Sequence, residues 1–320
     1  MHMELLQPRK ERAWGWPAVA NFIFAGSGAG FYLLFSFLMF IDADAPSGVI
    51  AGAAGLLSPA LVLLGFLAVS LEAGKPLRGR YMLYNLGSSW MSTEILAGSL
   101  FIFSAIIGRF FPATILQVTA ACAALGLIIS HGFILYRARA MTAWNVRAIP
   151  LLFISSALAL GGGILFIMSG LLQARLGRIS FTSVLICLLV DMIAWASYVW
   201  GSQDIPVRKA TDFLRRPLTL SFVTGLGHLV PSCLLIALMI TLGASESSWI
   251  RRLLVTLTGC CILAGGAIQK IVIILGANFM RGITIHVPDN NAPAVKVETT
   301  SARTGTGRER GKTSADSARH

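Results

Sequence analysis

The sequence predicts an all-α polytopic membrane protein, built as a bundle of eight transmembrane helices. Apolar residues make up 55% of the 320-residue chain and charged residues only 12%, whereas soluble proteins carry about 25% charged residues. The mean hydropathy of +0.74 agrees with this bias. The apolar residues are gathered in eight long runs separated by shorter polar segments. A chain with so little polar surface is expected to reside in a lipid bilayer.

Each of the eight runs is long enough to cross the hydrocarbon core as a helix, which takes about 20 residues. Helices satisfy their own backbone hydrogen bonds in lipid, and the runs are too long for membrane strands. In chain order they cover residues 17–41, 49–71, 91–111, 113–136, 148–172, 179–200, 218–243 and 251–277. The first run lacks a small-residue cleavage site, which favours a span over a signal peptide.

Three parts of the chain follow from these runs: an N-terminal segment (1–16), a transmembrane domain (17–281) and a C-terminal tail (282–320). The tail is polar, rich in small residues and mixed in charge, so we expect it to be flexible. Within the spans, the glycine groups at 26–30, 161–163 and 265–266 predict close helix packing. The alternative is that these glycines leave room for a flat ligand or for a partner.

The basic residues indicate how the chain is oriented. When the loops are assigned alternately to two sides, the side of the N-terminus collects thirteen Lys and Arg residues before the tail, and the other side collects five. The positive-inside rule then puts both termini in the cytoplasm, with the protein in the inner (cytoplasmic) membrane. A docking surface for another protein can also be basic. The net charge of +12 is explained by these loops and the tail, so we expect no nucleic-acid partner.

The cysteine and histidine patterns do not suggest a metal centre. The five cysteines lie inside apolar runs without a C-x-x-C motif: Cys122, Cys187, Cys233, Cys260 and Cys261. Zinc and iron–sulfur sites need closely spaced thiolates. Only His131 and His228 lie in spans, at unequal depth, whereas a b-type haem needs two histidines at matching depth. We expect no haem, iron–sulfur cluster or other metal in this chain.

Polar and aromatic residues gather at the span ends on the side of the N-terminus. Interfacial Trp and Tyr belts occur on both faces of a membrane protein and do not require acids or amides. A one-sided group that includes both therefore indicates a functional site. Its members include Asn21, Glu72, Trp90, His131, Tyr136 and Lys270.

Two ionisable residues lie nearer the middle of the membrane. Asp191 is in the sixth run and His228 in the seventh. Ionisable groups at this depth are costly and usually face an interior pathway. Either residue is a candidate for proton transfer, and the alternative for each is a structural hydrogen bond between helices.

Four stretches together resemble a known family. The segments "WGWPAVANFIFAGSGAGFYLL" (14–34), "LEAGKPLRGRYMLYNLGSSWMSTEI" (71–95), "WNVRAIPLLFISSALALGGG" (144–163) and "GGAIQKIVIILGA" (265–277) resemble polysulfide reductase-type (NrfD-like) and DMSO reductase-type membrane anchors. The resemblance covers most of residues 14–278, in order. Lys270 departs from it, because an Arg is expected there; lysine keeps the charge but loses the planar fork.

The resemblance implies an eight-helix subunit without prosthetic groups of its own. Such a subunit binds quinone (ubiquinone or menaquinone) and docks an iron–sulfur protein, which exchanges electrons with a molybdopterin catalytic subunit. The loop from Lys75 to Trp90 is expected to present basic side chains to that partner. A cytoplasmic polar face resembles the membrane subunit of a sulfite-oxidising molybdoenzyme, which implies quinone reduction coupled to oxidation of a sulfur compound such as sulfite.

Residue roles follow from this expected chemistry. Quinone reduction takes up protons, and the proton-transfer candidates are Glu72, His131, Asp191 and His228. The candidates for contact with the quinone are Asn21, Glu72, Trp90, His131, Tyr136 and Lys270. Two alternatives stay open at this point: a transporter or proton-translocating membrane subunit, and a purely structural anchor.

Overall fold

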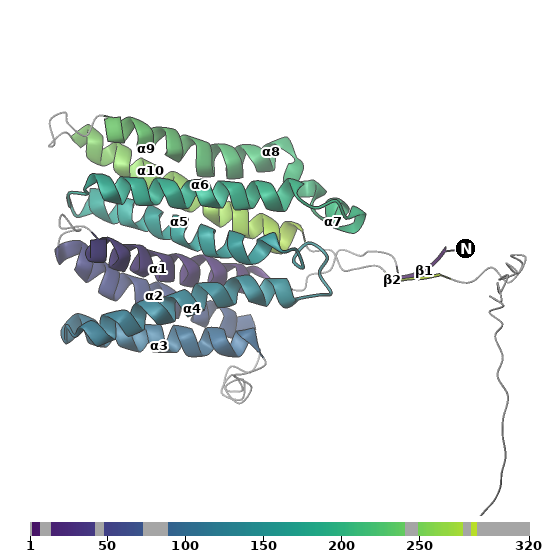
Figure 1. Cartoon of the computed structure of the whole chain (residues 1–320), viewed down its shortest axis with the longest axis horizontal. Coiled ribbons are helices and arrows are strands. Elements are labelled where there is room, and N and C mark those ends of the chain that lie inside the picture. Colours follow the sequence, from purple (N-terminus) through teal and green to yellow (C-terminus); the bar gives the residue numbers. More distant parts are fainter. Residues whose placement is uncertain are drawn as a thin grey trace, which may run out of the picture.

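A computed structural model describes residues 2–6, 14–41, 48–72, 89–240, 249–277 and 283–286, and these ranges form a helical bundle (Figure 1). Eight helical segments of the described ranges are long and apolar enough to cross a membrane. The predicted all-α bundle of eight transmembrane helices is therefore confirmed, and the span bounds agree closely with the apolar runs. The protein is a multi-pass membrane protein.

The first six spans are single α-helices. They are α1 (Trp16–Ile41), α2 (Gly48–Glu72), α3 (Trp90–Phe110), α4 (Thr114–Arg137), α5 (Ala148–Leu171) and α6 (Arg178–Trp200). The short α7 (Ile205–Ala210) and the 3-10 turn η2 (Asp212–Arg215) follow α6. The last span combines α10 (Trp249–Ile271) with the π-helical turn η5 (Val272–Gly276).

The seventh span, Pro217–Ile240, changes its helix type along its length. It consists of α8 (Pro217–Leu220), the π-helical segment η3 (Ser221–Leu229) and α9 (Val230–Ile240). Pro231 has no N–H and cannot donate to the carbonyl one turn before it. The Val230 N–H bonds to the Gly225 carbonyl, five residues back, as in a π-helix. The sequence predicted a single span here, over residues 218–243.

Two short strands pair the N-terminal segment with the predicted tail. β1 (His2–Leu6) and β2 (Ile283–His286) are antiparallel, with His2 opposite His286. Figure 1 places this sheet beyond the end of the bundle at which α7 lies. The rest of the predicted tail lies outside the described residues. So do residues 75–88 of the predicted loop from Lys75 to Trp90, and the basic residues of the N-terminal segment, Arg9, Lys10 and Arg12.

Helix α5 forms the centre of the bundle. It packs against α1, α4, α6 and α10, while α3 packs against α4 on one side and α9 against α10 on the other. The contact between α1 and α5 is made by glycines. A Cβ atom added at Gly161 would collide with the backbone of Gly30, and one added at Gly30 would collide with the Ala157 carbonyl. These two glycines therefore serve close helix packing, as the sequence predicted.

Candidate functional site

The first group of buried polar side chains joins three helices near one end of the bundle. We call Asn21 of α1, Glu94 of α3 and His131 of α4 the first cluster. Asn21 Nδ2 donates to Glu94 Oε1 at 2.6 Å, and His131 Nε2 lies 3.0 Å from the same oxygen. Each residue lies about two turns or less inside its helix end. An acid, an imidazole and an amide thus meet near one end of the bundle.

Burial differs among the three residues in a way that bears on access. Asn21 is 3% exposed and His131 is 1% exposed. The Glu94 side chain keeps 10% of its surface, against 1% for the His131 side chain. Glu94 is therefore the least enclosed member of the first cluster.

The surroundings of the first cluster hold Asn21 and His131 in place. The Phe22 ring meets the His131 ring edge-on, with 4.8 Å between the ring centroids. A Cβ atom at Gly65 of α2 would come within 2.9 Å of Asn21 Oδ1, so this glycine lets the amide lie against α2. Asn21 Oδ1 has no hydrogen-bond partner among the described residues. The role of Asn21 here is to donate to Glu94.

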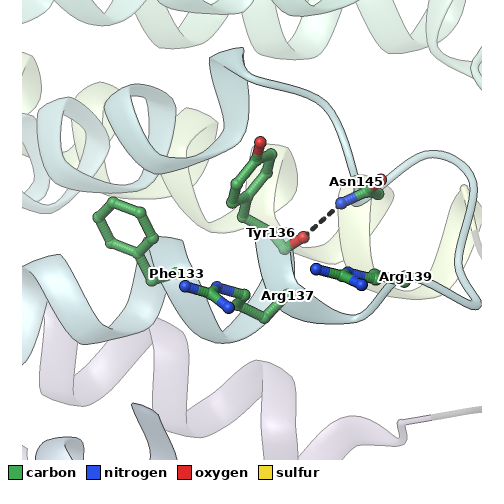
Figure 2. A pocket seen from close by; sticks show the side chains of 5 residues that line it. All are labelled: Phe133, Tyr136, Arg137, Arg139 and Asn145. Atoms are coloured by element: carbon green, nitrogen blue, oxygen red, sulfur yellow. Dashed lines mark hydrogen bonds between the residues drawn. The ribbon is translucent and has the colours of Figure 1, made fainter. Parts of the chain in front are cut away.

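A pocket of about 420 Å³ lies at the end of α4 (Figure 2). Its lining residues are Phe133, Tyr136, Arg137, Arg139 and Asn145. The Trp90 ring stacks on Phe133, with centroids 4.5 Å apart and an interplanar angle of 13°. Trp90 lies one turn before Glu94, on the same face of α3. The aromatic wall of the pocket is therefore continuous with the helix face that carries the Glu94 carboxylate.

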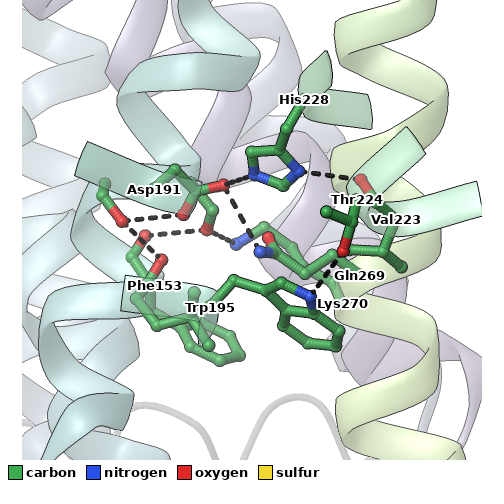
Figure 3. Close-up of polar contacts among 11 residues, drawn as sticks. Phe153, Asp191, Trp195, Val223, Thr224, His228, Gln269 and Lys270 are labelled. Carbon is green, nitrogen blue, oxygen red and sulfur yellow. Dashed lines mark hydrogen bonds and ion pairs between the residues drawn. The ribbon is translucent and has the colours of Figure 1, made fainter. Parts of the chain in front are cut away.

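A second group of buried polar side chains surrounds Asp191 of α6 (Figure 3). Ser155 Oγ of α5 donates to Asp191 Oδ1 at 2.7 Å. His228 Nε2 of η3 lies 3.0 Å from Asp191 Oδ2, and Gln269 Nε2 of α10 donates to the same oxygen at 3.3 Å. Asp191 and His228 are each 2% exposed. Four elements thus supply one buried hydrogen-bonded group.

Lys270 belongs to this second group. It follows Gln269 on α10, is 1% exposed and donates from Nζ to Ser156 Oγ at 2.7 Å. Nζ also lies 4.4 Å from the centroid of the Phe153 ring, a cation–π arrangement. No carboxylate of the described residues lies within 4.0 Å of this ammonium group. We call Ser155, Ser156, Asp191, His228, Gln269 and Lys270 the second cluster.

Two phenylalanines separate the clusters. Phe22, which contacts His131, meets Phe153 edge-on with 5.4 Å between centroids, and Phe153 carries Lys270 on its face. Two phenyl rings therefore exclude water from the line between the two clusters. The clusters are neighbours in the bundle, and within the described part of the chain no hydrogen bond joins their members.

The site residues predicted from the sequence lie in different places in the structure. Asn21 and His131 come together at Glu94, Tyr136 lines the pocket, and Trp90 stacks on the pocket residue Phe133. Lys270 instead lies in the second cluster, where Asp191 and His228 bind each other. Glu72 is the last residue of α2, and its side chain lies outside what the structure describes.

Sequence reasoning gave no role to Glu94 or Gln269. Both are at the N-terminal-side ends of spans, where the sequence showed polar residues gathering. A usable signal for Glu94 was its position inside the span, because an acid there needs a buried partner. Its partners come from α1 and α4, which no spacing within α3 reveals.

A bundle of eight membrane-length apolar helices that buries two acid–imidazole pairs defines an integral membrane protein. The model of the family described as DMSO reductase anchor subunit (DmsC) matches residues 11–274. The chain therefore belongs to the DMSO reductase anchor subunit family, and it is a membrane anchor of a molybdenum oxidoreductase complex. The family implies catalytic and iron–sulfur partner subunits. No curated protein matches the chain.

The family match confirms one part of the resemblance seen in the sequence, the part that concerns DMSO reductase-type anchors. The polysulfide reductase-type (NrfD-like) part stays a prediction. Quinone binding and the sulfur substrate also stay predictions at this point. The family description names an anchor subunit and does not mention a quinone or sulfite.

Proposed function

We propose that this chain is the quinone-binding subunit of its complex and passes electrons between the iron–sulfur subunit and the quinone pool. The quinone is ubiquinone or menaquinone. The observation that carries the proposal is the pocket at the end of α4: its lining residue Phe133 stacks on Trp90, which lies one turn from the Glu94 carboxylate that His131 contacts. The family supports it, because an anchor of a molybdenum oxidoreductase complex is where such a complex meets the membrane.

The pocket suits a flat ring that carries two oxygens. Its volume of about 420 Å³ lies within the range of about 300–1,000 Å³ that is typical of small-ligand sites. Phe133, already stacked on Trp90, supplies an aromatic face. Arg137, Arg139 and the Tyr136 hydroxyl are donors that a carbonyl oxygen can accept from.

The first cluster supplies the protons. Reducing a quinone to its quinol takes two electrons and two protons; the electrons come from the partner's iron–sulfur cluster. Glu94, the least enclosed member, gives a proton to the ligand oxygen and takes one back from His131. Asn21 donates to Glu94 Oε1 and fixes the carboxylate in position. Quinol oxidation would use the same groups in reverse.

The direction that we propose is from a sulfur compound such as sulfite to quinone, in the cytoplasm. Its support is the sequence alone: the basic residues on the side of the N-terminus put this face in the cytoplasm under the positive-inside rule. Purification of the complex from the membrane, followed by sulfite-dependent quinone reduction, tests it. A catalytic subunit that lies on the opposite side of the membrane from the N-terminus would contradict it.

Glu94→Gln tests the site in the assembled complex. The amide keeps the size of the side chain but carries no transferable proton, so quinone-coupled turnover should fall about 10²- to 10⁴-fold. Assembly with the partner subunits, followed by co-purification, should not change. Glu72→Gln is the parallel variant for the acid favoured by the sequence. Unchanged turnover in Glu94→Gln with intact assembly would instead favour a structural anchor.

A further inference from the structure

The Asp191–His228 pair lies away from the pocket, and the proposed quinone chemistry leaves it unused. The partners of the two ring nitrogens indicate which of them carry hydrogens. His228 Nδ1 lies 2.7 Å from the Val223 carbonyl oxygen, and a carbonyl only accepts, so Nδ1 carries a hydrogen. His228 Nε2 lies 3.0 Å from Asp191 Oδ2, a distance that needs a second hydrogen between them. The pair therefore holds one proton more than a carboxylate beside a neutral imidazole.

The surrounding donors show where that proton resides. Asp191 also accepts from Ser155 and Gln269, and a carboxyl group that accepts from several donors is stabilised as the carboxylate. The extra proton is then on His228, as an imidazolium that donates from both ring nitrogens. All the hydrogen bonds of the pair are satisfied in this form.

Lys270 makes this form electrostatically costly. The Asp191 carboxylate, the His228 imidazolium and the Lys270 ammonium leave one net positive charge inside the bundle. The other titratable group close by is the Cys187 thiol, one turn before Asp191 on α6; α5 contributes only the hydroxyls of Ser155 and Ser156. Release of the imidazolium proton would make the second cluster neutral, and buried net charge is unfavourable. It would also break the bond between His228 and Asp191.

The backbone around His228 allows that bond to break. His228 lies in the π-helical segment η3, and Pro231 follows within one turn. π-helical turns are rare in proteins, and they are found frequently at functional sites. Asp191 is held more rigidly. It lies in a regular α-helix, and its carboxylate accepts hydrogen bonds from Ser155 of α5 and Gln269 of α10.

We propose that the Asp191–His228 pair is a buried proton-binding site, which takes up and releases one proton on His228. In the released state the Lys270 ammonium is the remaining counter-charge to the Asp191 carboxylate. The reaction is His228 imidazolium to neutral His228 plus one proton, with no electron transferred. The site binds its proton independently of any quinone at the pocket.

Side-chain ¹⁵N NMR of histidine tests the proposal on the full chain in lipid nanodiscs without quinone, because the ring nitrogen shifts distinguish imidazolium from each neutral tautomer. His228 is assigned by the signal missing from His228→Gln. Between about pH 5 and 10, a range that extends above that of an ordinary histidine because the Asp191 carboxylate faces the ring, His228 should pass from the imidazolium to the neutral form protonated on Nδ1. A His228 signal that stays in one form over this range overturns the proposal.

Two substitutions should move the titration in opposite directions. Asp191→Asn removes the negative partner, so His228 should bind its proton about 10- to 1,000-fold more weakly. Lys270→Gln removes the competing positive charge, so His228 should bind it more tightly. Lys270→Arg keeps the charge and is the matched control, with little change expected. Shifts in the same direction for Asp191→Asn and Lys270→Gln would overturn the proposal.

Two further comparisons keep the test decisive. If Asp191→Asn fails to fold, the wild-type titration and the Lys270→Gln against Lys270→Arg comparison still decide it. Glu94→Gln should leave the His228 titration unchanged, because Glu94 belongs to the first cluster. The two proposals are therefore tested independently: contradicting the quinone site would not contradict the proton site, and the reverse also holds.

Discussion

Glu94 and Asp191 are each surrounded by donors from other helices, but in different numbers. Glu94 accepts from Asn21 and contacts His131, and it keeps a partly accessible side chain. Asp191 has three partners and is 2% exposed. An acid that exchanges protons with a ligand needs access, whereas an acid that binds an internal proton needs partners. The two carboxylates therefore suit different tasks within one bundle.

Asn21→Leu tests the support given to Glu94. The substitution removes the 2.6 Å bond and leaves Glu94 with His131 alone. We expect the complex to be destabilised by about 1–2 kcal/mol and quinone-coupled turnover to fall. Thermal unfolding and turnover of the purified complex measure the two effects. Ser58→Ala is the control, because its buried hydroxyl has no hydrogen-bond partner among the described residues; an equal loss there would mean that Asn21 has no special role.

Phe133→Leu tests the aromatic wall of the pocket. It removes the ring that stacks on Trp90 and faces the proposed ligand. Stacking of aromatic rings contributes about 0.5–1.5 kcal/mol beyond the buried area, so quinone affinity should fall by a comparable amount while the rate at saturating quinone changes less. Binding of quinone to nanodisc-embedded complex measures this. Phe103→Leu, at an exposed position of α3, should leave the affinity unchanged.

At this scale the sequence predicted residue types better than partners. Asn21 and His131 were assigned to one polar face from the alternation of span ends, and they do meet. The sequence favoured Glu72 over Glu94, because Glu72 adjoins the polar loop. Which of two acids is enclosed depends on helices from elsewhere in the chain, and no local pattern reports that.

Among the elements, the seventh span shows the limits of an apolar pattern most clearly. The sequence predicted one helix over residues 218–243. The π-helical segment Ser221–Leu229 has the same composition as an α-helix in lipid. The π-helical segment depends on which hydrogen bonds the backbone groups before Pro231 form. The hydrophobicity of the side chains gives no information about these bonds.

Gly161→Leu tests the contact between α1 and α5. A side chain there would push into the backbone of Gly30, so the two helices must separate or the leucine must distort. Overpacking of this kind costs about 1–3 kcal/mol or more. The melting temperature of the detergent-solubilised complex should fall, and the Asn21–Glu94 bond should be disturbed because α1 carries Asn21. Gly48→Ala, where nothing lies within 4 Å, is the control; equal effects would show that the α1–α5 contact is not tight.

Across the whole molecule, the number of spans was predictable and their neighbours were not. A run of about 20 apolar residues defines a span by itself, and all eight runs are helices. That α10 packs on α5, and so brings Gln269 and Lys270 to Asp191, depends on complementary surfaces. The glycine groups marked the tight contacts without saying which helix each would meet.

Topology is the whole-molecule property that the proposed direction of electron flow depends on. Lys209 on α7 and Thr114 at the start of α4 are both exposed and lie at opposite ends of the bundle by the order of spans. In Lys209→Cys, a membrane-impermeant maleimide should label inside-out vesicles, because the basic side is expected in the cytoplasm. In Thr114→Cys, it should label right-side-out vesicles instead.

The native cysteines set the background for this labelling and must be measured in parallel. Cys122, Cys233 and Cys260 are exposed on spans, where lipid rather than water covers them, so they should react little with a charged reagent in intact membranes. The reversed pattern of labelling would put the pocket and the first cluster on the outer face. The protons for quinone reduction would then come from the non-cytoplasmic side of the membrane. The partner subunits would have to dock on that side as well.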